Sequence, residues 1–67
     1  AYATEAVMAA TRQLRQRGVR RFVATVTVGN QASARVLQKA GFLFTRTLPG
    51  NDRIRGALVD DEEYVLD

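Results

Sequence analysis

Hydrophobic positions in the first part of the chain recur at helical spacing. Between Ala3 and Leu14 they stand at offsets 0, 3, 4, 7 and 11, which places them on one face of a helix over about residues 2–17. Gly18 ends the pattern, because glycine readily adopts the left-handed conformation that closes helices. The pattern predicts an amphipathic helix whose inward stripe consists of Ala3, Ala6, Val7, Ala10 and Leu14.

The period then changes to two. From Arg21 to Val28, apolar residues occupy alternate positions, and the positions between them hold valine and threonine. This composition predicts a strand that is buried on both faces. Gly29 and Asn30 interrupt the strand.

The second half of the chain predicts one helix and two strands. Helical spacing returns from Gln31 to Ala40, and Gly41 supplies a left-handed stop. Phe42 to Leu48 predicts a strand, Pro49-Gly50-Asn51-Asp52 a turn, and residues 58–66 a last strand. The inward side of the second helix is expected to carry Ala32, Val36, Leu37 and Ala40.

The predicted order is helix, strand, helix, strand, strand, which indicates an α/β fold. We expect the first strand, the crossover helix and the second strand to form a right-handed parallel βαβ unit. The last strand then runs antiparallel, so the sheet is mixed. Such a small sheet leaves edges and a face open, and we expect further strands beside the first one, outside residues 1–67.

Composition is that of a small globular domain. The 67 residues are 46% hydrophobic and 25% charged, and they include no Cys and no His. This excludes disulfides, the usual zinc sites and nucleophile systems that use His or Cys. No apolar run approaches membrane-spanning length and no signal-peptide pattern is present, so we expect a cytoplasmic protein without membrane contact. The short core and the uncapped first helix favour a fragment of a larger domain.

Charge is divided unevenly along the chain. Residues 1–46 carry eight basic side chains against one acid, a net +7, and residues 47–67 carry two against six, a net −4. A basic half can attract a polyphosphate, so a small nucleic-acid-binding module is one alternative to an enzyme. Arg12 to Arg21 lack interleaved aromatic side chains for base stacking, so nucleic acid is not the partner we expect. A non-catalytic interaction module is the other alternative.

The acidic run Asp60–Glu63 allows two interpretations. It protects an edge strand from unwanted pairing, or else these acids or Asp52 attract a cationic amine. No other metal-ligating residues accompany Asp60 and Asp61, so we expect no metal site.

The junction after the first strand carries the most informative polar residues. Asn30 precedes the second helix, where its side chain can cap the helix by accepting a hydrogen bond from the backbone N–H of Ser33. The junction also lies at the carboxyl end of a strand that we expect to be parallel, where open α/β sheets place ligands. Ser33 lies in the first helical turn, in a positive field that suits a developing anion.

Two segments together resemble the GNAT superfamily of N-acetyltransferases. They are Ala1-Tyr2-Ala3-Thr4-Glu5-Ala6 and Asn30-x-x-Ser33-x-x-Val36-Leu37-x-Lys39-x-Gly41-Phe42. The resemblance covers essentially the whole chain and is greatest to the branch that acetylates ribosomal-protein N-termini. It implies that residues 1–67 are the C-terminal portion of a single acetyltransferase domain, with a partial GNAT fold.

The resemblance also implies an acetyl-CoA site at the start of the first helix. Ala3 matches the small residue that ends the family's cofactor motif, Ala1 stands where glycine is usual, and the upstream Gln or Arg has no counterpart here. The free amides and the dipole of a helix N-terminus agree with an anion site. The cofactor-binding residues implied are Ala1, Tyr2, Ala3, Thr4, Asn30 and Ser33.

The implied reaction moves an acetyl group from acetyl-CoA to a primary amine by direct attack in a ternary complex. Ser33 is the implied catalytic residue, donating a hydrogen bond or proton to the departing thiolate, because Leu37 stands where many relatives carry tyrosine. Asp52 stands about where some relatives place an acid, but Asp in a turn commonly stabilises the turn itself, so the general base stays open. We expect activity only from the intact domain. The implied partners are acetyl-CoA, an amine acceptor, and a second copy or the N-terminal half.

Overall fold

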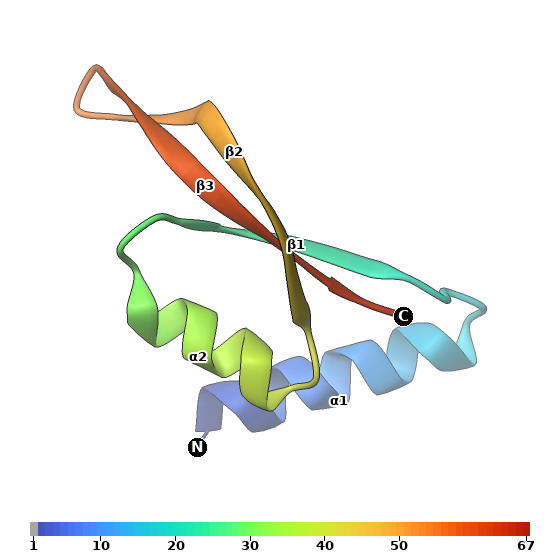
Figure 1. The fold of residues 1–67 in the computed structure, drawn as a ribbon. Helices are drawn as coiled ribbons and strands as arrows, with labels where there is room; N and C mark the ends of the chain where they lie inside the picture. Colours follow the sequence, from blue (N-terminus) through green and yellow to red (C-terminus); the bar gives the residue numbers. More distant parts are fainter. Residues whose placement is uncertain (1) are drawn as a thin grey trace.

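Two helices pack against one face of a small sheet (Figure 1). The computed structural model describes residues 2–67, with the order α1 (Tyr2–Gln16), β1 (Phe22–Thr27), α2 (Gln31–Lys39), β2 (Leu43–Ile54) and β3 (Ala57–Leu66). Gly18 and Gly41 follow the helices with φ of +97° and +99°, which confirms the predicted left-handed stops. None of the helices in residues 2–67 has the length and apolar content needed to cross a membrane.

The strand order corrects the predicted topology. β3 lies between β1 and β2, and both pairs of neighbouring strands are antiparallel. The predicted mixed sheet with a parallel βαβ unit is therefore wrong. β1 and β2 do run in the same direction, but the connection through α2 is long enough to leave a space between them. β3 fills that space, where its backbone forms hydrogen bonds with two strands instead of one.

The hairpin between β2 and β3 turns later than the sequence suggested. The predicted turn at Pro49–Asp52 is wrong, because β2 continues through it to Ile54. The turn consists of Arg55 and Gly56, with φ of +52° and +81°. Left-handed conformations at both central residues characterise the two-residue turns that suit the twist of antiparallel strands.

The segment that resembles a turn forms an irregularity within β2. The register passes from Leu48 opposite Asp61 to Asp52 opposite Val59, so β2 holds extra residues between these pairs. Proline is tolerated there because β2 lies at the edge of the three-stranded sheet in the described part of the chain.

The core lies between the sheet and the helices. Val26, Phe42 and Tyr64 are its buried members, and Tyr64 also makes an edge-to-face contact with Phe44. Val23, on the opposite face of β1, is 59% exposed. The prediction of a strand buried on both faces is therefore wrong for residues 2–67, where the described helices cover only one face of the sheet.

α1 is rotated relative to its predicted stripe, whereas α2 keeps Val36, Leu37 and Ala40 inward as predicted. Thr4, Val7 and Thr11 are the more buried residues of α1, whereas Ala6 and Ala10 are exposed. Alanine buries little apolar area, so three alanines in the predicted stripe do not fix the rotation of the helix. In α2 the partly buried residues are Ala34, Val36 and Leu37, with Ala40 just beyond the helix, whereas Ala32 is exposed.

The core arrangement predicts unequal effects of two phenylalanines. We expect Phe42→Ala to lower the free energy of unfolding of the intact protein by about 3–5 kcal/mol, because it empties a site in the core. Phe44→Ala is the control, since Phe44 is 50% exposed and should cost less. Urea denaturation measures both values, and equal losses would contradict the placement of the core.

Glu63 is held as a carboxylate by its neighbours across the β2–β3 pair. Its Oε1 accepts a hydrogen bond from the Thr45 hydroxyl at 2.8 Å, and its oxygens lie 3.4 Å from two nitrogens of Arg46. The Thr45 hydrogen bond, and secondarily Arg46, lower the pKa of Glu63 below its ordinary value of 4.5. A lowered pKa means that this stabilisation is complete above 4.5 and is lost as the pH falls through the lowered pKa.

Removing the Thr45 hydroxyl should therefore move the pKa of Glu63 back toward 4.5. We expect this shift in Thr45→Val, measured by ¹³C NMR titration of the side-chain carboxyl group. Thr47→Val removes a hydroxyl two residues along the same strand and should leave the titration unchanged. Identical midpoints in the two variants would show that Thr45 does not hold the carboxylate.

Candidate functional site

The turn between β1 and α2 sets the position of the α2 N-terminus. Gly29, with φ of +96°, allows the chain to reverse sharply after β1. The Asn30 Oδ1 then accepts a hydrogen bond from the Ser33 backbone N–H at 3.3 Å. This confirms the predicted N-cap.

The field at the start of α2 is positive. The first backbone N–H groups of a helix have no partners within the helix, and the helix dipole adds to their partial charge. The first turn of α2 contains no acidic side chain. No acidic side chain of the first turn therefore offsets the positive field at this helix end. Ser33 lies in this turn, within that field.

A cavity of about 300 Å³ lies between α1, β1 and α2, and we refer to it as the interhelical cavity. Ala3, from the first turn of α1, and Ser33, from the first turn of α2, both line this cavity, although they are far apart in sequence. Its lining is mostly apolar and consists of Ala3, Val7, Ala24, Thr25, Val26, Ser33, Val36 and Leu37.

The first turn of α1 holds a buried hydroxyl group without a partner. Thr4 is 7% exposed, and its Oγ1 has no hydrogen-bond partner within residues 2–67. Such a group is costly unless a ligand or water completes it. Tyr2 is 87% exposed and does not line the cavity, and Ala1 lies outside the described residues.

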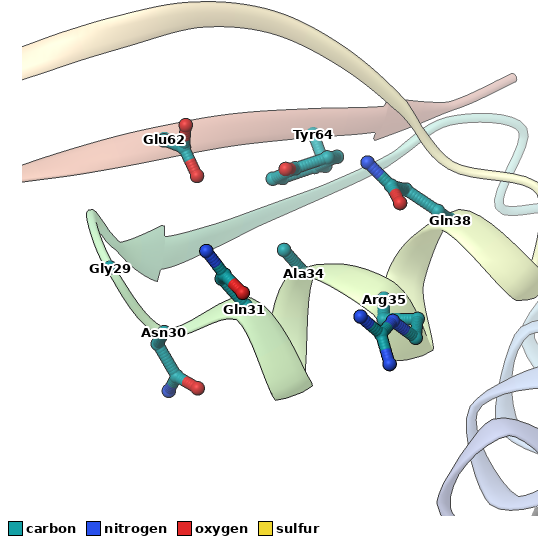
Figure 2. Close-up of a pocket in the computed structure, with 8 residues that line it drawn as sticks. All are labelled: Gly29, Asn30, Gln31, Ala34, Arg35, Gln38, Glu62 and Tyr64. Carbon is teal, nitrogen blue, oxygen red and sulfur yellow. The ribbon is translucent and has the colours of Figure 1, made fainter.

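A second cavity, of about 280 Å³, lies between α2 and β3 (Figure 2). We refer to it as the α2–β3 cavity. Asn30 lines this cavity and Ser33 lines the interhelical one, although the Asn30 side chain accepts a hydrogen bond from the Ser33 backbone N–H. The lining residues are Gly29, Asn30, Gln31, Ala34, Arg35, Gln38, Glu62 and Tyr64. The sequence singled out the run Asp60–Glu63 but did not separate Glu62 from its neighbours, although alternation along the last strand places Glu62 on the same face as Tyr64.

The other charged candidates are placed away from the helix ends. Asp52 is exposed in the irregular part of β2 and accepts a hydrogen bond from the N–H of Arg53 at 2.7 Å. The described residues contain no group of three or more potential metal ligands.

Two arginines of the basic half contact the end of the chain. Arg15 donates to the Asp67 carbonyl oxygen and stacks on the Phe22 ring, and Arg21 lies 3.4 Å from the Asp67 carboxylate.

Solved structures of acetyltransferases share this fold. The chain is 29% identical to an acetyltransferase from Salmonella typhimurium that modifies the N-terminal serine of a 50S ribosomal subunit protein, with a TM-score of 0.75 over 92% of the chain and 35% of that structure. It is 28% identical to RimL, a ribosomal-protein alpha-N acetyltransferase in complex with coenzyme A, with a TM-score of 0.84 over 90% of the chain and 34% of that structure.

A more distant structure has the same fold. The microcin self-immunity acetyltransferase MccE, in complex with acetyl-CoA and AMP, is 23% identical, with a TM-score of 0.88 over 94% of the chain and 36% of that structure. The chain thus spans about a third of the length of these structures. Among curated proteins, none matches the chain significantly.

A family model supplies the assignment. The acetyltransferase (GNAT) domain model matches residues 1–43, a segment that includes α1, β1, α2, Asn30 and Ser33. This confirms the resemblance identified in the sequence. The chain belongs to the GNAT acetyltransferase family.

Proposed function

We propose that the interhelical cavity binds acetyl-CoA, and that the intact protein transfers the acetyl group to a primary amine. The observation that carries this proposal is the meeting of two helix N-terminal turns at one apolar cavity, one through Ala3 and the other through Ser33. Helix N-termini attract anions, and apolar walls suit an uncharged carrier arm. RimL and MccE, whose structures hold coenzyme A or acetyl-CoA, share the fold.

The first turn of α1 fits the phosphate end of this cosubstrate. Its backbone N–H groups and the buried Thr4 hydroxyl are donors, and the hydroxyl has no partner within residues 2–67. Ala3 keeps the wall small where a ligand has to approach the backbone. Bound acetyl-CoA would supply the acetyl group as a thioester.

Ser33 is the residue of this chain that we assign to the leaving sulfur. It carries the only hydroxyl in α2, whose sequence is QASARVLQK, and it lies at a helix end without acidic neighbours in the first turn. Its Oγ can donate a hydrogen bond or a proton to a thiolate as negative charge develops there. Leu37, one turn later in the same cavity, offers only apolar contact.

The acceptor is a primary amine, and a protein N-terminus is one candidate. Two relatives of similar fold act on ribosomal-protein N-termini, and the chain shares 28% and 29% identity with them over about a third of their length. Only a neutral amine attacks a thioester, so a base or a water chain has to remove a proton from the acceptor. We assign no residue of this chain to that step, since Asp52 forms a local hydrogen bond in the hairpin.

Replacing Ser33 tests the proposed mechanism. We expect Ser33→Ala in the intact protein to lower kcat roughly tenfold to a thousandfold, with little change in the Kd of CoA measured by calorimetry. Thr47→Val is the control, because it removes a hydroxyl from a residue that does not line this cavity and should retain activity. Unchanged kcat in Ser33→Ala would remove Ser33 from the mechanism. A wild-type protein that does not bind CoA would refute the proposed function.

Two substitutions separate the roles of Asn30. Asn30→Ala should lower the free energy of unfolding by about 1 kcal/mol and lower kcat, because it removes the cap that positions Ser33. Asn30→Ser preserves a capping oxygen and should restore both properties. Native stability combined with weak CoA binding in Asn30→Ser would instead indicate direct contact between the Asn30 carboxamide and the cofactor.

A further inference from the structure

The structure distinguishes the four acids at the start of the last strand. Three have hydrogen-bond donors within the chain: Asp60, Asp61 and Glu63 accept from Gly50, Asn51 and Thr45 at 2.9, 2.9 and 2.8 Å. Glu62 has no hydrogen-bond donor and no ion-pair partner within residues 2–67. Of the four acids, Glu62 is the one that lines the α2–β3 cavity.

Glu62 occupies an unusual place in the sheet. It lies on the central strand, opposite Val26 of β1 and Thr47 of β2, on the same face as the buried Tyr64. This face carries the core, and Glu62 itself is half-buried. A carboxylate partly removed from water is costly unless a donor compensates for its lost hydration.

The α2–β3 cavity is lined by a carboxylate, side-chain amides and the aromatic ring of Tyr64. Figure 2 shows Glu62 and Tyr64 facing α2, with Gln31 and Gln38 extending from α2 toward β3. The side chain of Asn30 points away from β3 in the same view. Arg35 also lines the cavity, but it forms no ion pair with Glu62 within residues 2–67.

We propose that the α2–β3 cavity binds a small organic ammonium ion through the carboxylate of Glu62. An ammonium group donates three hydrogen bonds, and the Glu62 carboxylate is a matching acceptor. The side-chain amides of Gln31 and Gln38, drawn with their nitrogens toward β3 in Figure 2, offer oxygen acceptors once they rotate. The Tyr64 ring adds a surface to which cations are attracted. A divalent metal fits less well, because the described residues contain no group of three potential metal ligands.

This site is distinct from the proposed acetyl-CoA site. Glu62 and Ser33 line different cavities, which are separated by α2. An ammonium ion beside Glu62 is therefore not the amine that reacts with a thioester held beside Ser33. The inference consequently goes beyond the proposed function and can be tested without measuring acetyl transfer.

Titration of the intact protein with 1,4-diaminobutane tests the proposal. Calorimetry should show binding of the diamine, and none of 1,4-butanediol, its uncharged analogue of similar length. Glu62→Gln should weaken diamine binding about tenfold or more, because it removes a charged acceptor while retaining the shape of the side chain. Asp60→Asn removes one negative charge from the neighbouring position, outside the cavity, and should leave the affinity unchanged.

Several outcomes would overturn the proposal. Equal weakening in Glu62→Gln and Asp60→Asn would indicate general attraction to an acidic surface, and equal binding of diamine and diol would exclude recognition of charge. Absence of diamine binding to the wild type would also refute it.

Should Glu62→Gln fail to fold, NMR of the wild-type protein provides the test. Shifts of the Gln31 and Gln38 side-chain amides on adding diamine support the site, and shifts confined to other residues contradict it. Calorimetry with CoA separately reports on the proposed function.

Discussion

The pairing of β3 with both β1 and β2 is the constraint on which the rest of the structure depends. It joins two strands that are connected only through α2, and it does so with antiparallel hydrogen bonds on both sides. It also fixes which residues of β3 face the helices. Tyr64 enters the core and Glu62 faces the cavity beside it because they alternate with Asp61 and Glu63 along one strand. A register shift by one residue would exchange these two sets.

Local signals predicted the helices well, because each signal acts through neighbouring residues. Gly18 and Gly41 close α1 and α2, and Asn30 caps α2 as its sequence position suggested. The hairpin turn was missed because Pro49–Asp52 has a stronger turn composition than Arg55 and Gly56. In the edge strand this composition instead produces an irregularity.

Non-local features could not be predicted in the same way. The position of β3 results from competition between two sheet edges, and no short motif reports it. The rotation of α1, which buries Thr4 and exposes Ala6, depends on what the helix packs against. At the site, the sequence indicated Ala3 and Ser33, and the structure brings both to one cavity. The sequence did not indicate that Glu62 lines the α2–β3 cavity, because this depends on the distance between β3 and α2.

The two cavities beside α2 differ in character because one helix presents different residue types on its two sides. Ser33, Val36 and Leu37 face the interhelical cavity, where apolar walls meet helix ends whose field is positive. Gln31, Ala34 and Gln38 line the cavity beside β3, which also holds the carboxylate of Glu62 and the guanidinium group of Arg35. Anionic and cationic groups are therefore favoured on opposite sides of a nine-residue helix. Since α2 is rigid on this scale, the Asn30 cap that fixes its first turn influences the geometry of both cavities at once.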